Sequence, residues 1–120
     1  MEVKEAIMAF SQSEKIKAGL IWVSQTLEFL KGLPEGEKKG AEKVSHTLLH
    51  MIGQEVSLAK AIAGKNEWGE IEALIDRAII MVNSGVGQEA TMHLTKALSI
   101  TTTIGHRSMS LLKEQNLLDG

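Results

Sequence analysis

The sequence contains no cysteine, and only 3% of its 120 residues are aromatic. Without cysteine the chain has no disulfide bond, no thiolate metal ligand and no thiol nucleophile. Methionine, in contrast, occurs 6 times. We therefore expect a core that is mostly aliphatic and adaptable in its packing.

The chain also lacks a strong charge of either sign and a long apolar run. The formal net charge is -2, so no global field favours binding to nucleic acid. No uninterrupted apolar run is longer than that of residues 78–82, far short of the roughly 20 residues of a membrane-spanning helix. The N-terminal segment MEVKEAIMAF carries acidic residues and no long apolar stretch, so we expect no secretory signal. These features predict a soluble, cytoplasmic protein without a nucleic-acid or membrane partner.

Helical periodicity fills every long segment of the chain, and no β-type alternation occurs. The pattern predicts four amphipathic helices, over residues 2–31, 35–63, 67–82 and 87–115. The turns GLPEG, which holds the only proline, and NSGVG separate the first pair and the last pair of helices. Gly64 is predicted to cap the second helix in a left-handed conformation.

Four amphipathic helices joined by short turns predict an all-α, antiparallel up-down-up-down four-helix bundle. The composition, 43% hydrophobic and 23% charged, is that of a globular chain, and residues 1–120 are expected to form a single domain. The third helix is shorter than the others by about three turns. One end of the bundle is therefore expected to be open, or to be covered by the N-terminal segment or a second subunit.

Two histidines, His46 and His50, lie four residues apart in the second predicted helix. At about 100° per residue, the apolar side chains of this helix gather around Leu48, which is predicted to mark the core face. The residues that define this face are Val44, Leu48, Met51, Ile52, Ala59 and Ile62. Both histidines lie roughly 160° from Leu48, so we expect them to point away from the core.

The four residues Ser45-His46-Thr47-Leu48 resemble the start of the motif that carries the accepting histidine of histidine-containing phosphotransfer domains. That motif has the form (Ala/Ser)-His-Thr-Leu-Lys-Gly, on the second helix of a four-helix bundle. The resemblance implies that His46 accepts a phosphoryl group from a receiver aspartate. The chain departs from the motif at its last two positions, where Leu49 replaces the lysine and His50 replaces the glycine.

A metal site is a second alternative, because His46 and His50 have the i, i+4 spacing that can chelate one divalent ion. Di-iron bundles, however, carry inward carboxylates with Glu-x-x-His spacing, and the chain contains no Glu-x-x-His sequence. We therefore predict no metal cofactor, with these two histidines as the only weak candidates. No other cofactor is predicted either.

Glu55 lies about 20° from the centre of the predicted apolar face of the second helix. Because burial of an unpaired carboxylate is unfavourable, Glu55 is expected to be partnered, protonated or placed where the bundle opens. Arg77 is the favoured ionic partner. The candidate hydrogen-bond partners are Thr101, Ser13 and Ser108. Glu55, Arg77 and Thr101 are thus predicted to form either a structural polar network or the polar part of a ligand pocket.

Small residues replace the larger aliphatic residues expected on the core face of the fourth helix. Ala97, Thr101, Gly105 and Ser108 occupy successive turns. Small side chains in a row either let another helix approach closely or leave a groove for a ligand.

Several apolar residues are predicted to point outward, as a contact surface would require. They are Trp22, Ile21 and Ile7 on the first helix and Ile80 on the third. They favour a homodimer formed through the first helix. Because no coherent catalytic set is present, we predict a non-catalytic interaction or assembly module. Phosphotransfer at His46 and binding of a metal or small ligand remain the two alternatives.

Overall fold

The computed structural model describes residues 2–63 and 66–116, so Gly64, the predicted cap, lies outside the described residues. The described chain forms four α-helices and one 3-10 turn, and it contains no strand. The elements are α1 (Val3–Leu30), α2 (Glu35–Ala63), α3 (Asn66–Asn83), η1 (Gly87–Ala90) and α4 (Thr91–Glu114). The predicted all-α class is confirmed. The first four residues of the fourth predicted helix form the 3-10 turn, and the helix ends one residue earlier than predicted, at Glu114.

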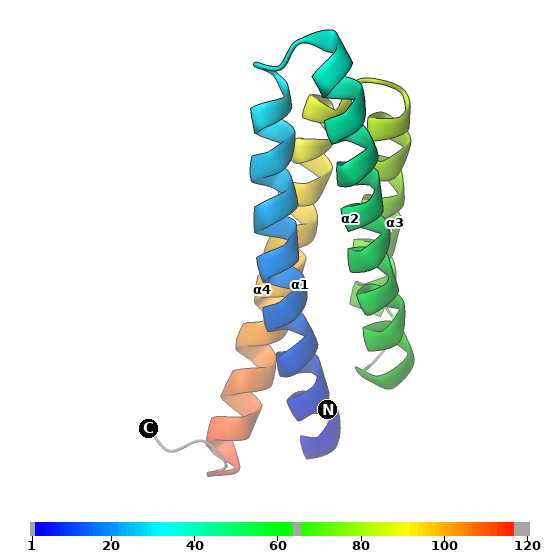
Figure 1. Cartoon of the computed structure of the whole chain (residues 1–120). Helices are drawn as coiled ribbons and strands as arrows, with labels where there is room; N and C mark the ends of the chain where they lie inside the picture. The colour runs from blue at the N-terminus through cyan, green and yellow to red at the C-terminus, as the bar shows by residue number, and fades with distance from the viewer. Residues whose placement is uncertain (1, 64–65, 117–120) are drawn as a thin grey trace.

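Consecutive helices run antiparallel and surround one core (Figure 1). α1 packs against α2 and α4, and α3 packs against the same two helices from the diagonal position. This arrangement is the predicted up-down-up-down four-helix bundle. Because α3 has 18 residues while α1 has 28, the start of α1 and the end of α4 project beyond the end of α2 and the start of α3 (Figure 1).

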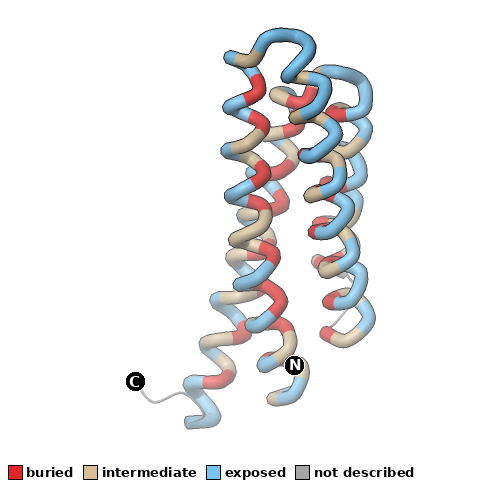
Figure 2. The backbone as a smooth tube through the Cα atoms, in the orientation of Figure 1, coloured by how far each residue is buried: buried red, intermediate tan, exposed pale blue. Residues whose placement is uncertain are grey.

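The core runs along the inward side of all four helices (Figure 2). On α1 the predicted apolar stripe is buried almost as expected, from Ala6 through Leu20 to Leu30. The largest fully buried side chains of the core come from all four helices. They are Ile16, Leu20, Leu27, Leu30, Leu49, Ile71, Ile75 and Leu94.

The rotation of α2 about its axis differs from the sequence prediction. The buried residues of α2 are Ser45, Leu49, Ile52, Val56, Ala59 and Ala63. Leu48, the predicted centre of the core face, is only partly buried, while Val44 and Met51 are 59% and 55% exposed. The buried residues centre about 60° away from Leu48. The apolar residues of α2 span a wider arc than the neighbouring helices α1 and α3 can cover. The sequence does not show which part of this arc the two neighbours bury.

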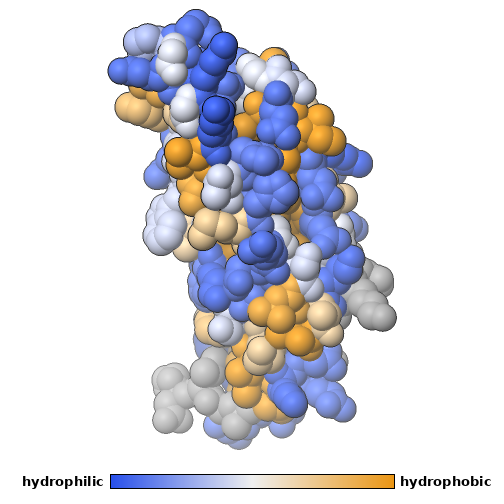
Figure 3. All heavy atoms as spheres, turned by 45° about the vertical axis from the view of Figure 1, so that its right-hand side comes forward, coloured by the Kyte–Doolittle hydropathy of each residue, from blue (hydrophilic) through white to orange (hydrophobic). Residues whose placement is uncertain are grey.

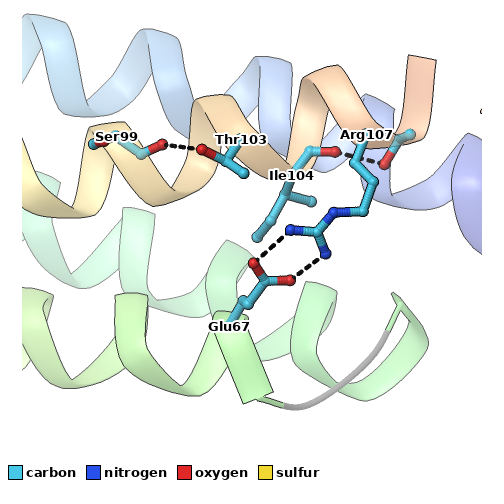
Figure 4. A network of polar contacts seen from close by, with 6 residues as sticks. Glu67, Ser99, Thr103, Ile104 and Arg107 are labelled. Carbon is cyan, nitrogen blue, oxygen red and sulfur yellow. Dashed lines mark hydrogen bonds and ion pairs between the residues drawn. The ribbon is translucent and has the colours of Figure 1, made fainter. Parts of the chain in front are cut away.

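Ion pairs connect α3 to both of its neighbours. The Arg107 guanidinium donates two hydrogen bonds to the Glu67 carboxylate, at 2.6 and 2.8 Å, and so joins the start of α3 to α4 (Figure 4). On the other side, Glu72 accepts hydrogen bonds from Lys60 and Ser57 of α2, both at 2.7 Å. Paired planar groups such as Arg107–Glu67 fix orientation as well as distance.

α1 and α4 approach closely at Gly105. A Cβ atom at this position would lie 2.8 Å from the Ser13 hydroxyl oxygen, which itself donates a hydrogen bond to the Phe10 carbonyl at 2.8 Å. Thr101 and Ser108 continue the contact as buried residues on the same helix. The small residues of α4 therefore serve close helix packing at Gly105.

Replacing Gly105 with alanine is expected to lower the free energy of unfolding, because the methyl group collides with Ser13, and overpacking of this kind costs about 1–3 kcal/mol. The gain in helix propensity, about 1 kcal/mol, offsets part of this cost, so we expect a net loss of up to about 2 kcal/mol. Urea unfolding followed by circular dichroism measures the change. Gly40→Ala is the control, because Gly40 is a helical position with open space around its Cβ, and it should stabilise the protein. An equally stabilising Gly105→Ala would contradict the packing argument.

Candidate interaction surface

Glu55 lies at the edge of the α1–α2 contact and not inside the core, so the predicted inward position is wrong. Its carboxylate accepts a hydrogen bond from the Lys15 ammonium at 2.7 Å, and its side chain is 32% exposed. Gln12 approaches the same carboxylate at 3.5 Å and donates to the Glu55 carbonyl at 3.1 Å. Glu55 lies outside the core because α2 is rotated about its axis relative to the prediction. This rotation turns Glu55 toward the surface beside α1.

The predicted partners of Glu55 lie elsewhere. Arg77 is exposed on α3. Thr101 and Ser108 are buried, and each donates its hydroxyl hydrogen to a carbonyl of its own helix, to Ala97 at 2.7 Å and to Ile104 at 2.8 Å. The structure therefore does not bring Glu55, Arg77 and Thr101 together. Lys15, which the sequence prediction missed, is the ionic partner.

The hydrogen bond from Lys15 holds the pKa of Glu55 below its ordinary value of 4.5. Partial desolvation opposes this shift, and Gln12 adds to it. Glu55 is consequently ionised near neutral pH, and Lys15 and Glu55 form a neutral pair at the surface.

An apolar cavity of about 240 Å³ lies between α1 and α2, next to this ion pair. Ile16, Gly19, Val23, Leu48 and Ile52 line it, together with Trp22, Met51 and the Lys15–Glu55 pair. Gly19 faces Ile52 across the helix contact, and a Cβ at Gly19 would lie 3.1 Å from Ile52 Cγ1. Gly19 thus lets Ile52 of α2 pack closely against α1 at the edge of the cavity.

Large exposed apolar side chains continue this surface on both helices. Trp22 and Phe29 on α1 are 68% and 70% exposed and lie seven residues apart. On α2 the exposed residues recur at the same interval, at Val44, Met51 and Leu58. Seven residues are about two helical turns, so these side chains lie on the same side as the cavity. We call the surface made by these five residues, Gly19, Leu48 and the Lys15–Glu55 pair the α1–α2 face.

The α2 part of this face has the spacing of a coiled-coil seam. Its residues follow one another at alternating steps of four and three: Val44, Leu48, Met51, Glu55, Leu58 and Ile62. The buried residues from Ser45 to Ala63 follow the same steps, shifted by one residue. α2 therefore carries two neighbouring heptad seams, an inner seam in the bundle core and an outer seam that is only partly covered. The seven-residue spacing is the sequence signal that points to Met51, Leu58 and Phe29, which the sequence prediction did not assign to a site.

The predicted interface residues are exposed, but they do not form one patch. Ile7, Ile21 and Ile80 are 50%, 37% and 63% exposed. Ile80 lies on α3, diagonal to α1, and Ile21 points about 100° away from Trp22. Of the four, only Trp22 belongs to the α1–α2 face. Figure 3, which turns the right-hand side of Figure 1 forward, shows separate hydrophobic patches within a largely hydrophilic surface.

His46 and His50 lie on α2 outside the inner seam, His46 half-buried and His50 exposed. Their rings meet edge to face, with centroids 4.5 Å apart. His46 also borders a polar hollow lined by Lys39, Glu42, Lys43 and the turn of residues 82–85. Leu49, at the lysine position of the phosphotransfer motif, is fully buried in the core.

The described residues contain no group of three or more histidine or acidic side chains arranged to hold a metal ion. Among the same residues, no helix combines the length and the apolar character that crossing a membrane requires. Comparisons with protein-family models, with curated proteins and with solved structures each returned no match.

Stability is expected to fall as the pH drops below about 4.5, because Lys15, Arg107 and Lys60 lower the pKa values of their partners Glu55, Glu67 and Glu72 from 4.5. The folded state therefore binds these protons less readily than the unfolded state. The stabilisation is present above the unfolded pKa and is lost as the pH falls through the folded pKa.

Each of these partly exposed pairs contributes on the order of 0.2–1 kcal/mol. Urea unfolding at a series of pH values between neutral and acid measures the loss. A Glu55→Gln variant should show a smaller loss on acidification than the wild type. An identical pH profile for both proteins would show that the Lys15–Glu55 pair does not contribute.

Proposed function

We propose that this protein is a non-catalytic interaction module that docks a helical partner on the α1–α2 face. The observation that carries the proposal is the outer seam of α2, a second heptad pattern that the bundle itself covers only in part. Heptad seams are the sequence pattern by which helices recognise helices, with side chains of one helix entering gaps of the other. The cavity beside Gly19 is such a gap.

The exposed apolar area supplies a driving force for docking. Covering the exposed part of Trp22 removes on the order of 100 Å² from water, which corresponds to about 2.5 kcal/mol. Phe29 and Met51 add further apolar area at the same face. Aromatic anchors beside a pocket are typical of the few residues that dominate binding energy.

The helical backbone of α1 and α2 limits which kinds of partner can bind the α1–α2 face. Their peptide groups are hydrogen-bonded within the helices, so the face offers no open sheet edge to an extended peptide. Recognition must therefore come from side chains that fit into the groove. An amphipathic helix, or a pair of helices, meets that requirement.

Phosphotransfer at His46 receives less support from the local geometry. The lysine position of the motif is the buried Leu49, and the glycine position is His50, whose ring lies against His46. A receiver that approaches His46 meets this second imidazole.

The docking face is tested by the native size of the protein in lysate from its source cells. Wild-type protein should elute above the monomer mass, and Met51→Lys should shift it to the monomer mass by placing a charge on the outer seam. Met92→Lys is the matched control, because Met92 is 71% exposed on α4. An unchanged complex with Met51→Lys, or monomer mass for the wild type both in lysate and as purified protein at high concentration, would refute the proposal.

The phosphotransfer alternative is tested by incubating the protein with acetyl phosphate or a phosphorylated receiver. We expect no acid-labile phosphate on the wild type, because His50 crowds His46. Label that appears on the wild type and disappears in His46→Gln would establish phosphotransfer instead.

A further inference from the structure

We propose that the helical partner of the α1–α2 face is a second copy of this chain, and that each copy places Trp22 over the cavity of the other. This inference rests on the proposed function, because it names the partner of the same face. In a two-fold dimer the same patch must be complementary to itself. The face therefore has to provide both the inserted side chains and the gaps that receive them.

The α1–α2 face provides both. Trp22 is the protruding side chain, 68% exposed, and the gap is the cavity of about 240 Å³ beside it. An engineered apolar cavity of about 150 Å³ holds a benzene molecule, so the larger volume here suits an indole ring. Its lining is almost entirely apolar.

A two-fold axis parallel to the helices places α1 of each copy opposite α2 of the other, in antiparallel orientation. Such an axis leaves the height along the bundle unchanged, so residues that are level within one copy face each other between copies. Trp22 is level with Leu48 and Met51, because all three line the same cavity. Each Trp22 therefore meets the outer seam of the second copy.

The charges of the face are complementary in the same arrangement. Lys15 and Glu55 are level, since their charged atoms lie 2.7 Å apart. Across the dimer, Lys15 of each copy then faces Glu55 of the other, and the four groups alternate in sign. Such complementarity fixes the register of an interface. The net charge of -2 per chain adds little repulsion between the copies.

The dimensions of the face also favour a second copy over a single helix. α1 and α2 lie side by side over roughly 30 Å, and together they are about 20 Å wide. Two copies would bury roughly 1,200 Å² in total, at the lower limit of stable interfaces, whereas one helix would cover about half of the face. Interfaces at this lower limit include the weak and transient ones, so we expect a Kd on the order of micromolar.

The test uses the purified full chain in sedimentation velocity from about 1 to about 500 µM, a range that brackets a micromolar Kd. The wild type should pass from monomer to dimer across this range. Trp22→Ala should weaken the dimer at least about tenfold, while Met92→Ala leaves it unchanged. Circular dichroism checks that each variant keeps its helices, as expected for exposed positions.

Reversing the charge of Lys15 or of Glu55 tests how the two copies are aligned along the helix axes. Lys15→Glu leaves two acidic groups at this level of the face, and Glu55→Lys leaves two basic ones. Each variant alone should dimerise more weakly than the wild type, whereas an equimolar mixture should recover the dimer, because opposite charges then face each other across the interface. A purely structural role for the pair inside one chain would not be rescued by mixing.

A wild type that stays monomeric over the whole range, or a mixture that fails to recover, would overturn the inference. The same result does not by itself refute the proposed function. If the purified protein is monomeric but forms a complex in lysate that Met51→Lys abolishes, the docking face stands and its partner is another helical protein.

Discussion

The structure depends on one constraint, the width of the apolar arc on α2. An inner seam from Ser45 to Ala63 closes the core, and an outer seam one residue away carries Leu48, Met51 and Leu58. A helix in a square bundle has two neighbours, and here these neighbours cover only the inner seam completely. The remaining apolar surface collects on one side, beside Trp22 and Phe29 of α1, and produces the cavity and the α1–α2 face.

The order and bounds of the helices were predictable, because they depend on local signals. The second helix begins at Glu35, directly after the turn that holds the only proline, and it ends at Ala63, as predicted. The inward stripe of α1 was predictable for a similar reason, since its buried residues recur at three- and four-residue steps along one row, although Trp22 and Phe29 lie outside that row. In such a row, the residues that the periodicity predicts to face inward are the residues that are buried.

The rotation of α2 was not predictable in the same way. Its apolar residues fill two adjacent rows, and the choice between them depends on how α1 and α3 pack against it. A core centred on Leu48 places Glu55 inside and makes Arg77 and Thr101 its expected partners. The observed partner, Lys15, follows only once Leu49 occupies the core and Glu55 lies beside α1. The surplus of apolar residues on α2 was therefore visible in the sequence, but its meaning as a second surface required the packed structure.

The central claim is that the outer seam is covered when the protein assembles. Methyl NMR of the methionine side chains in concentrated protein, with a soluble paramagnetic probe, tests it within one sample. Met51 and Met92 are 55% and 71% exposed in the single chain. The account predicts that the probe broadens the Met92 methyl signal strongly and leaves the Met51 signal largely protected. Equal broadening of the two signals would contradict it.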